Sequence, residues 1–137
     1  MRRILDAWAV LAWLNAERPG SDAVQALLDQ AEERRVELGI NMVNVGEVFY
    51  TLAKRKGVEC ARGFWEDLQT APVRIMDAPN SLILEAAQWK SQYPISYGDA
   101  FALATAHRES ALLVTGDPDF RRFIGREPAM VEWIGER

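Results

Sequence analysis

Short apolar runs alternate with longer segments whose apolar residues recur at helical spacing along nearly the whole chain. The runs are four or five residues long, as buried strands are, whereas residues 22–35 place Val24, Leu27, Leu28 and Ala31 on one helical face. The expected strands are residues 3–5, 36–40, 73–76, 111–114 and 130–134. The expected helices are residues 7–17, 22–35, 43–56, 60–68, 79–91 and 97–109, followed by a turn or short helix over 117–122.

Glycine, proline and serine mark several of the expected helix ends. The first helix should break at Pro19-Gly20, Ser21 should cap the second, and Gly57 should end the third. Strands that are separated by helices imply right-handed crossovers and a parallel sheet covered on both faces. The pattern therefore predicts a single domain over residues 1–137, a three-layer α/β/α sandwich with a mainly parallel sheet of about five strands.

Composition narrows the class of protein. The formal net charge of −4 argues against a non-specific nucleic-acid binder, which is normally basic, but it is compatible with an enzyme whose excess acid is neutralised by a divalent metal. The single cysteine, Cys60, excludes an internal disulfide and suits a reducing cytosol. Met1-Arg2-Arg3 before apolar residues 7–14 resembles a short signal peptide, but Asp6 interrupts the pattern. No apolar run is long enough to span a membrane, and we expect a cytoplasmic protein.

Acidic residues follow two of the expected strands and lie on two of the expected helices. Asp6 ends the first strand, Asp117 and Asp119 follow the strand at 111–114, Asp99 begins an alanine-rich helix, and Glu47 lies within another helix. In open α/β sheets, ligands bind beyond the carboxyl ends of the strands. Carboxylates gathered there repel one another unless a hard cation neutralises them. The pattern indicates Mg²⁺ or Mn²⁺ and phosphate chemistry, and one Cys with one His argues against zinc.

Each acid also has an ordinary structural interpretation. Asp6 could simply cap the helix that follows it, and Ser96-Tyr97-Gly98-Asp99 has the spacing of a capping box. Glu47 lies on the polar side of its helix, where a solvated glutamate is the usual finding. Asp117 and Asp119 flank a proline, as in an ordinary turn. Against the capping interpretation, Asp99 heads an apolar helical stripe, where an unpaired carboxylate is costly.

Four segments in order resemble the PIN-domain nucleases. They are ILDAWAVLAWL at 4–14, NVGEVFY at 44–50, YGDAFALATA at 97–106 and LVTGDPDF at 113–120. The resemblance spans nearly the whole chain, whose length is similar to that of the small VapC-type toxins of toxin–antitoxin pairs. No one segment is specific, but the four occur together in register. Glycine at position 46, directly before Glu47 and inside the helix, is unusual because it costs about 1 kcal/mol relative to alanine.

The resemblance implies an activity and a set of residues. The activity is metal-dependent hydrolysis of RNA by an endoribonuclease, leaving 5′-phosphate and 3′-hydroxyl ends, with Mg²⁺ or Mn²⁺ as the cofactor. The implied catalytic residues are Asp6, Glu47, Asp99 and Asp117, with Asn44, Thr115 and Asp119 in support. The implied metal ligands are Asp6, Asp99 and Asp117. The implied partners are an antitoxin protein and a second copy in a homodimer, and Trp8 or Trp13 could contact such a partner.

Basic residues near the acids are candidates for contact with the RNA backbone. Lys54-Arg55-Lys56 ends the Glu47 helix, and Arg121-Arg122 follows the Asp117 turn. The alternative is that they are helix-terminal charges that favour solubility and the helix dipole.

Two other functions remain open from the sequence. The first is a PIN-fold interaction domain without catalytic activity. The second is a receiver domain that accepts phosphate on aspartate, but receivers usually carry an acidic pair after the first strand and a lysine after the last. Here Asp6 has no acidic neighbour and no lysine follows Asp117.

Overall fold

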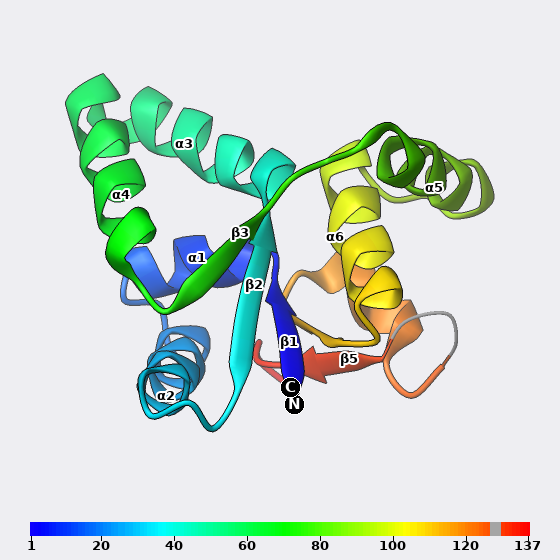
Figure 1. Ribbon diagram of the computed structural model, residues 1–137, viewed down its shortest axis with the longest axis horizontal. Coiled ribbons are helices and arrows are strands. Elements are labelled where there is room, and N and C mark those ends of the chain that lie inside the picture. Colours follow the sequence, from blue (N-terminus) through cyan, green and yellow to red (C-terminus); the bar gives the residue numbers. More distant parts are fainter. Residues whose placement is uncertain (127–129) are drawn as a thin grey trace.

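The computed structural model describes residues 1–126 and 130–137, and its centre is a parallel sheet with the strand order β3-β2-β1-β4-β5 (Figure 1). The strands are β1 (Arg2–Leu5), β2 (Glu37–Asn41), β3 (Val73–Met76), β4 (Leu112–Thr115) and β5 (Val131–Trp133). The helices are α1 (Ala7–Leu14), α2 (Gly20–Glu32), α3 (Met42–Lys56), α4 (Val58–Thr70), α5 (Asn80–Gln92) and α6 (Tyr97–Arg108). A 3₁₀ helix, η1 (Pro118–Phe123), follows β4. The predicted α/β/α sandwich is confirmed.

Consecutive residues of a strand belong to hydrophobic cores on opposite faces of the sheet. In β1, Leu5 packs with apolar side chains of α1 to α4, whereas Ile4 packs with α5 and α6. In β4, Val114 and Leu113 divide in the same way. This is the two-residue period of a strand covered on both sides. Figure 1 shows the two groups of helices on either side of the sheet.

Several helix ends differ from the sequence prediction. The first helix stops at Leu14, because Asn15 and Ala16 turn back on it and Ala16 adopts a left-handed φ of 53°. The prediction that Ser21 caps the second helix is wrong. This helix begins at Gly20, so Ser21 lies inside its first turn and is buried there. The shifts leave the candidate acids in place: Asp6 lies between β1 and α1, Glu47 in α3, Asp99 in α6, and Asp117 and Asp119 after β4.

The order of the strands indicates at which edge of the sheet a binding crevice is expected. The chain builds β1, β2 and β3 outward in one direction and then returns to add β4 on the other side of β1. Because the direction of building reverses at β1, a crevice is expected at the carboxyl ends of β1 and β4. Leu5, the last residue of β1, pairs in register with Val114 of β4. The residues that follow these strands are therefore brought together. Among the described residues, no helix is both long and apolar enough to cross a membrane.

Candidate active site

One threonine hydroxyl connects the acids that follow β1 and β4. Thr115 Oγ1 donates a short hydrogen bond to Asp6 Oδ2 and accepts one from the backbone N–H of Asp117 at 3.0 Å. Asp6 Oδ1 accepts from the N–H of Ala9 at 2.8 Å, so Asp6 also caps α1. Only 2% of Asp6 is exposed and Thr115 is fully buried. Asp6 thus has both the capping role and a place beside Asp117.

Glu47 is held at the site by its own helix. Asn44, one turn earlier in α3, donates from Nδ2 to Glu47 Oε1 at 2.7 Å and to the backbone carbonyl of Gly98 at 3.0 Å. Asn44 is 1% exposed, and its Oδ1 has no partner among the described residues. The interpretation of Glu47 as a solvated surface residue is therefore wrong. The polar side of α3 faces the start of α6, and one buried amide connects the two helices.

The remaining acids meet at the start of α6 and of η1. Ser96 caps α6, because its Oγ accepts the N–H of Asp99 at 3.1 Å. Asp117 caps η1 by accepting the N–H of Asp119 at 2.9 Å. One carboxylate oxygen from each of Asp99, Asp117 and Asp119 lies within 4.8 Å of the other two. The sequence-based ligand set had Asp6 in place of Asp119, so the closest trio differs by one member.

Burial, with a smaller contribution from neighbouring carboxylates, raises the pKa of three acids at this site. Burial raises the pKa of Asp6 to about 7, against hydrogen bonds from Thr115 and Ala9 that lower it, and the charges of Asp99 and Asp117 add to the increase. Burial, followed by the charge of Asp117, raises the pKa of Asp99 to about 7 as well. Burial also raises the pKa of Glu47, its hydrogen bond with Asn44 lowers it, and the charge of Asp117 raises it further. The site therefore favours a bound cation or a bound proton.

The donor set fits a hard divalent metal. The oxygens of Asp99, Asp117 and Asp119 are the ligand type that Mg²⁺ and Mn²⁺ prefer, and they lie close enough together to share one ion. Asn44 Oδ1, which is buried and has no partner in the part of the chain that the structure describes, is a further oxygen acceptor beside the site that a water or an ion could satisfy.

Comparison with known proteins is consistent with this geometry. The family model described as the PIN domain matches residues 3–125, which is most of the chain. The chain belongs to the PIN domain family. No curated protein matches it.

Solved structures share the fold of this PIN domain. VapBC2 from Rickettsia felis, bound to a DNA fragment from its promoter, superposes with a TM-score of 0.72 and 17% identity over 96% of this chain and 98% of that one. VapC20 from Mycobacterium tuberculosis, described as a sarcin-ricin loop cleaving toxin, has a TM-score of 0.70 and 18% identity over 88% and 93% of the two chains. FitAcB from Neisseria gonorrhoeae has a TM-score of 0.67 and 20% identity over 95% and 96%. At these identities the likeness shows the fold.

The candidate RNA-contact residues lie at different distances from the acids of the PIN domain. Lys54, Arg55 and Lys56 are exposed at the far end of α3, about 10 Å or more along the helix from Glu47. Arg121 lies in η1, stacks on Trp133 with its guanidinium 4.7 Å from the ring centroid, and donates to the Glu136 carbonyl. The α3 cluster is therefore remote from the acids, whereas Arg121 and its exposed neighbour Arg122 begin two residues after Asp119.

Two glycines of the site were not found from the sequence. A Cβ on Gly98 would overlap the Glu47 carboxylate, and a Cβ on Gly116 would overlap the Trp8 ring and the backbone of Gly135. Trp8 therefore packs on the Asp117 turn. Gly98 directly precedes Asp99 in the first turn of a helix, a position where glycine is costly, and this cost was the available signal. Gly46, the glycine that the sequence did mark, has nothing within 4 Å of its Cβ position.

Proposed function

We propose that this PIN domain is a metal-dependent endoribonuclease that hydrolyses RNA phosphodiester bonds. The observation that carries the proposal is the convergence of Asp6, Glu47, Asp99, Asp117 and Asp119 at the carboxyl edge of the sheet. Their charges affect one another's pKa values, and three of them present oxygens within 4.8 Å. Acidic groups of this kind at a switch point of a parallel sheet support phosphate chemistry that uses Mg²⁺ or Mn²⁺.

The contacts of each residue suggest a different role in the reaction. Asp99, Asp117 and Asp119 would hold the metal, which when bound supplies charge for the phosphate and lowers the pKa of water. Glu47, held by Asn44 and with a raised pKa, is placed to orient the attacking water and to accept its proton. Attack at phosphorus with departure of the 3′-oxygen leaves a 5′-phosphate and a 3′-hydroxyl. Asp6 and Thr115 hold the Asp117 turn in position.

We further propose that the protein is the toxin of a toxin–antitoxin pair. VapBC2, FitAcB and the toxin–antitoxin complex from Klebsiella pneumoniae share its fold, and the last of these has a TM-score of 0.66. An apolar groove of about 180 Å³ supports a protein partner. It is lined by Val10, Trp13, Val24, Leu28, Phe64 and Leu68 among others. These residues come from α1, α2 and α4, which lie on the same side of the sheet (Figure 1). This groove suits the apolar face of an antitoxin helix.

The structure distinguishes the two tryptophans that were predicted to contact a partner. Trp13 is 37% exposed and lines the groove, where its Nε1 donates to Gln25. Trp8 is instead partly buried, and its ring packs on Gly116. We therefore propose Trp13, and not Trp8, as the antitoxin contact.

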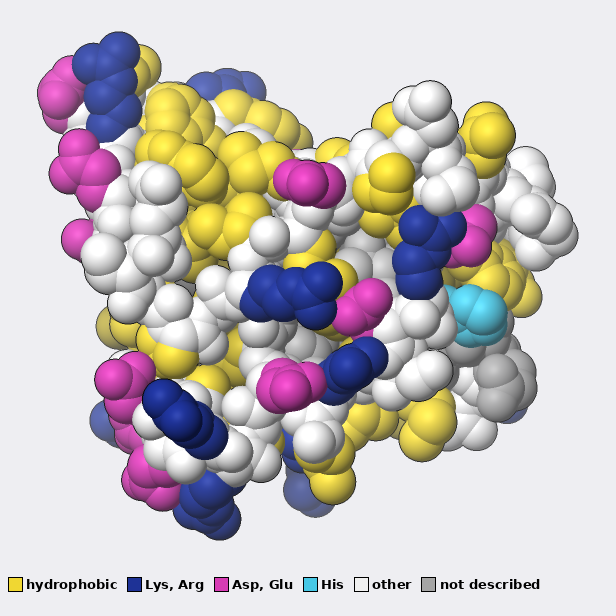
Figure 2. Space-filling view, viewed as in Figure 1, with side chains coloured by type: hydrophobic (Ala, Val, Ile, Leu, Met, Phe, Trp, Pro, Cys, Tyr) yellow, Lys and Arg dark blue, Asp and Glu magenta, His cyan; other side chains and the backbone are white. Residues whose placement is uncertain are grey.

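A second copy of the chain is the other proposed partner. Figure 2 shows hydrophobic side chains exposed over α3 and α4, and the exposed large residues there are Met42, Tyr50 and Val58. Large apolar side chains exposed on neighbouring helices are candidates for a protein interface. Sedimentation of wild type and Tyr50→Asp tests the homodimer, because the added charge should shift a dimer toward monomer. A wild-type monomer at all concentrations would contradict it.

The test of the nuclease is cleavage of a mixed RNA pool by wild type and Asp99→Asn, with Mn²⁺ or with chelator. We expect cleavage by wild type with Mn²⁺ only, and an Asp99→Asn rate lower by about a hundredfold or more. End-labelling of the products should show 5′-phosphates. Intact RNA together with failure to bind Mn²⁺ would favour the interaction domain without catalytic activity.

A further inference from the structure

Residues 133–136 lie against the start of the turn that follows β4. Trp133 of β5 pairs in register with Thr115, the last residue of β4. The backbone N–H of Ile134 donates to the Thr115 carbonyl at 3.0 Å. Asp117 comes two residues after Thr115. The contacts of residues 133–136 with this turn therefore begin directly before its first acid.

Two glycines bring the backbones of the segment and the turn into direct contact. A Cβ on Gly135 would lie 2.9 Å from both the Cα and the carbonyl oxygen of Gly116. A Cβ on Gly116 would in turn lie 2.7 Å from the Cα of Gly135. Because the neighbouring atoms belong to the backbone, a side chain at either position would push the two segments apart. The turn and residues 133–136 are therefore packed as closely as backbones can be.

Arg121 connects the same segment to the far side of the turn. It lies in η1, two residues after Asp119, and its guanidinium is 4.7 Å from the centroid of the Trp133 ring. Its Nη2 donates to the Glu136 carbonyl at 3.1 Å, and Trp133 Nε1 donates to the same carbonyl at 3.0 Å. The guanidinium, the indole and the carbonyl thus hold one another. Residues 133–136 therefore contact the turn on both sides of its two aspartates.

The Arg121 contact fixes the rotation of η1. Hydrogen bonds in a short 3₁₀ helix have poorer geometry than those of an α-helix, so its orientation depends on side-chain contacts. Phe120 and Phe123, three residues apart on one face, are 0% and 2% exposed and pack in the core with α5 and α6. A helix anchored on one face can still roll about that face. Arg121 anchors a second face to residues 133–136, which sets the direction of the Asp119 side chain.

Asp119 needs this support more than the other acids do. It is exposed, whereas Asp6 is buried and bonded to Thr115. One of its carboxylate oxygens nevertheless lies within 4.8 Å of oxygens of Asp99 and Asp117. A small rotation of η1 would carry this oxygen away from the other two, so the orientation of η1 decides whether three oxygens can share one ion.

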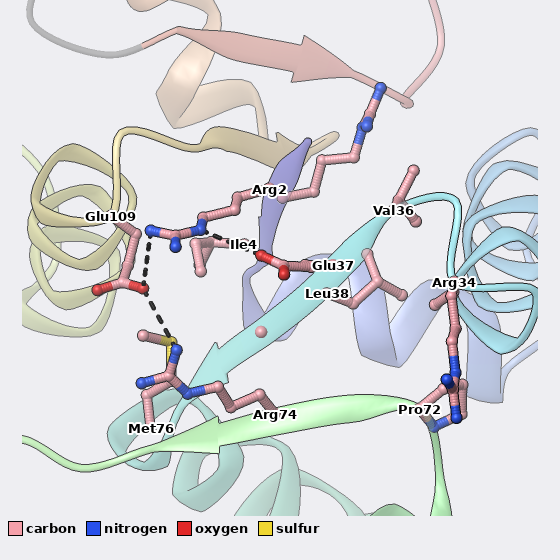
Figure 3. A pocket seen from close by; sticks show the side chains of 13 residues that line it. Arg2, Ile4, Arg34, Val36, Glu37, Leu38, Pro72, Arg74, Met76 and Glu109 are labelled. Atoms are coloured by element: carbon pink, nitrogen blue, oxygen red, sulfur yellow. Dashed lines mark hydrogen bonds and ion pairs between the residues drawn. The ribbon is translucent and has the colours of Figure 1, made fainter.

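Arg121 is held differently from the arginines at the amino-terminal ends of the strands. There Arg2 donates to Glu37 at 3.1 Å, and Arg74 lies 3.6 Å from Glu109 (Figure 3). Within residues 1–126 and 130–137, Arg121 forms no ion pair with a carboxylate. A carboxylate partner would add another negative charge close to the acids of the turn, and a ring with a carbonyl does not. The contact therefore orders η1 without adding to the repulsion among the acids.

We propose that Arg121 is a positioning residue for the metal site, which fixes η1 against Trp133 and the Glu136 carbonyl and so holds Asp119 beside Asp117. The inference rests on the proposed function, because that function makes Asp119 a ligand of the metal. It gives Arg121 a different role from the RNA contact expected from its place in the sequence. The contacts with Trp133 and Glu136 direct the guanidinium toward residues 133–136.

The test is isothermal titration calorimetry of Mn²⁺ into the full chain, with wild type, Arg121→Ala, Trp133→Leu and the double variant. Arg122→Ala is the matched control, because Arg122 is the exposed neighbour in the same 3₁₀ helix and has the same charge. Loss of a positive charge near a cation site should by itself tighten Mn²⁺ binding, whereas loss of positioning should weaken it. The two effects therefore differ in sign. Circular dichroism checks that each variant is folded.

We expect Arg121→Ala and Trp133→Leu each to raise the Kd for Mn²⁺ by about threefold to tenfold, at or below the lower end for groups that orient metal ligands. The double variant should lose no more than the weaker binder of the two, because the residues are halves of one contact. Arg122→Ala should bind Mn²⁺ at least as tightly as wild type. In RNA cleavage, Arg121→Ala should lower kcat and leave KM unchanged.

The inference is overturned if Arg121→Ala binds Mn²⁺ as wild type does, and a raised KM for RNA would then make Arg121 an RNA contact. It is equally overturned if Arg122→Ala weakens Mn²⁺ binding as much as Arg121→Ala. Failure of the proposed function looks different, because it is seen in wild type. If wild type binds Mn²⁺ but cleaves no RNA, calorimetry still decides the role of Arg121. If wild type binds no Mn²⁺, both proposals fall.

Discussion

The carboxylate of Glu47 occupies the space that a side chain at position 98 would need. The two residues lie on different helices, α3 and α6, and the Asn44 amide bridges the Glu47 carboxylate and the Gly98 carbonyl. Gly98 is also the residue before Asp99. The position of Glu47 therefore depends on the lack of a side chain at position 98, next to Asp99. A change in the first turn of α6 should affect both acids.

Replacing Gly98 with alanine should displace Glu47 without unfolding the protein. The overlapping atoms are the end of a flexible side chain, which can rotate away at little cost. Moving a catalytic group by about 1 Å can lower a reaction rate by about a hundredfold. We therefore expect the cleavage rate to fall by about tenfold to a hundredfold. Stability in urea should change by less than about 1 kcal/mol.

Gly46→Ala is the matched control, because Gly46 adjoins Glu47 and its Cβ would contact nothing within 4 Å. We expect unchanged cleavage and a free energy of unfolding higher by about 1 kcal/mol, because alanine is the better helix former. Equal cleavage rates for the two variants would contradict the role of Gly98.

Asp119→Asn should weaken binding of Mn²⁺. Asp119 contributes one of the three oxygens that lie within 4.8 Å of one another, and an amide is a poorer ligand for a hard cation than a carboxylate. We expect the dissociation constant from calorimetry to rise by about tenfold. Asp22→Asn is the control, because Asp22 is an exposed helix aspartate that pairs with Arg18 away from the site. An unchanged Mn²⁺ affinity in Asp119→Asn would leave Asp119 as an ordinary residue of the turn with no role as a ligand.

The metal-free protein should lose stability as the pH rises from about 4 to about 7. The pKa of Asp6 is raised from 3.8 to about 7 by burial, so the folded chain binds more protons than the unfolded chain in this window. Its contribution is therefore complete below pH 4 and is lost as the pH passes 7, about 4 kcal/mol in total. Urea unfolding in chelator at pH 5 and pH 8 measures this change.

Asp6→Asn should flatten this pH dependence, and Mn²⁺ at pH 8 should restore stability to wild type, because a cation replaces the missing protons. Asp99, whose pKa is raised to about 7 by burial and by Asp117, should leave a residual slope in that variant. Stability that is constant or rises between pH 5 and pH 8 in chelator would show that the carboxyls titrate normally.

Trp13→Ala should weaken binding of the proposed antitoxin while leaving RNA cleavage intact. Trp13 lines the apolar groove, and aromatic anchors in such grooves contribute about 2 kcal/mol or more to binding. The measurement is copurification and calorimetry with the proposed antitoxin, for which the product of the adjacent gene is the first candidate to test. Leu84→Ala is the control, because Leu84 is 70% exposed on α5 and does not line the groove. Equal affinity for both variants would remove Trp13 from the interface.

Much of this architecture could be predicted because it depends on local patterns. The helical and strand periods placed most elements within a few residues, and Asp6 and Asp117 follow strands whose apolar runs are unmistakable. Strands of a parallel sheet end at the same edge, so these acids could be expected to meet. The errors occur at helix ends, as at Ser21, where a single backbone turn at Pro19 and Gly20 decided the start.

By itself, the sequence determined the order of elements, the fold class and the acids at the strand ends, because these follow from residue spacing. Only the tertiary structure decided that β4 pairs with β1, so that Thr115 reaches Asp6 across 109 residues of chain. It also decided that the polar side of α3 faces α6, so that Glu47, which its helical period alone would place in solvent, is partly buried and held by Asn44. The contact between Gly98 and Glu47 joins two helices from distant segments, so the sequence could show the cost of a glycine at position 98 but not the side chain that needs its space.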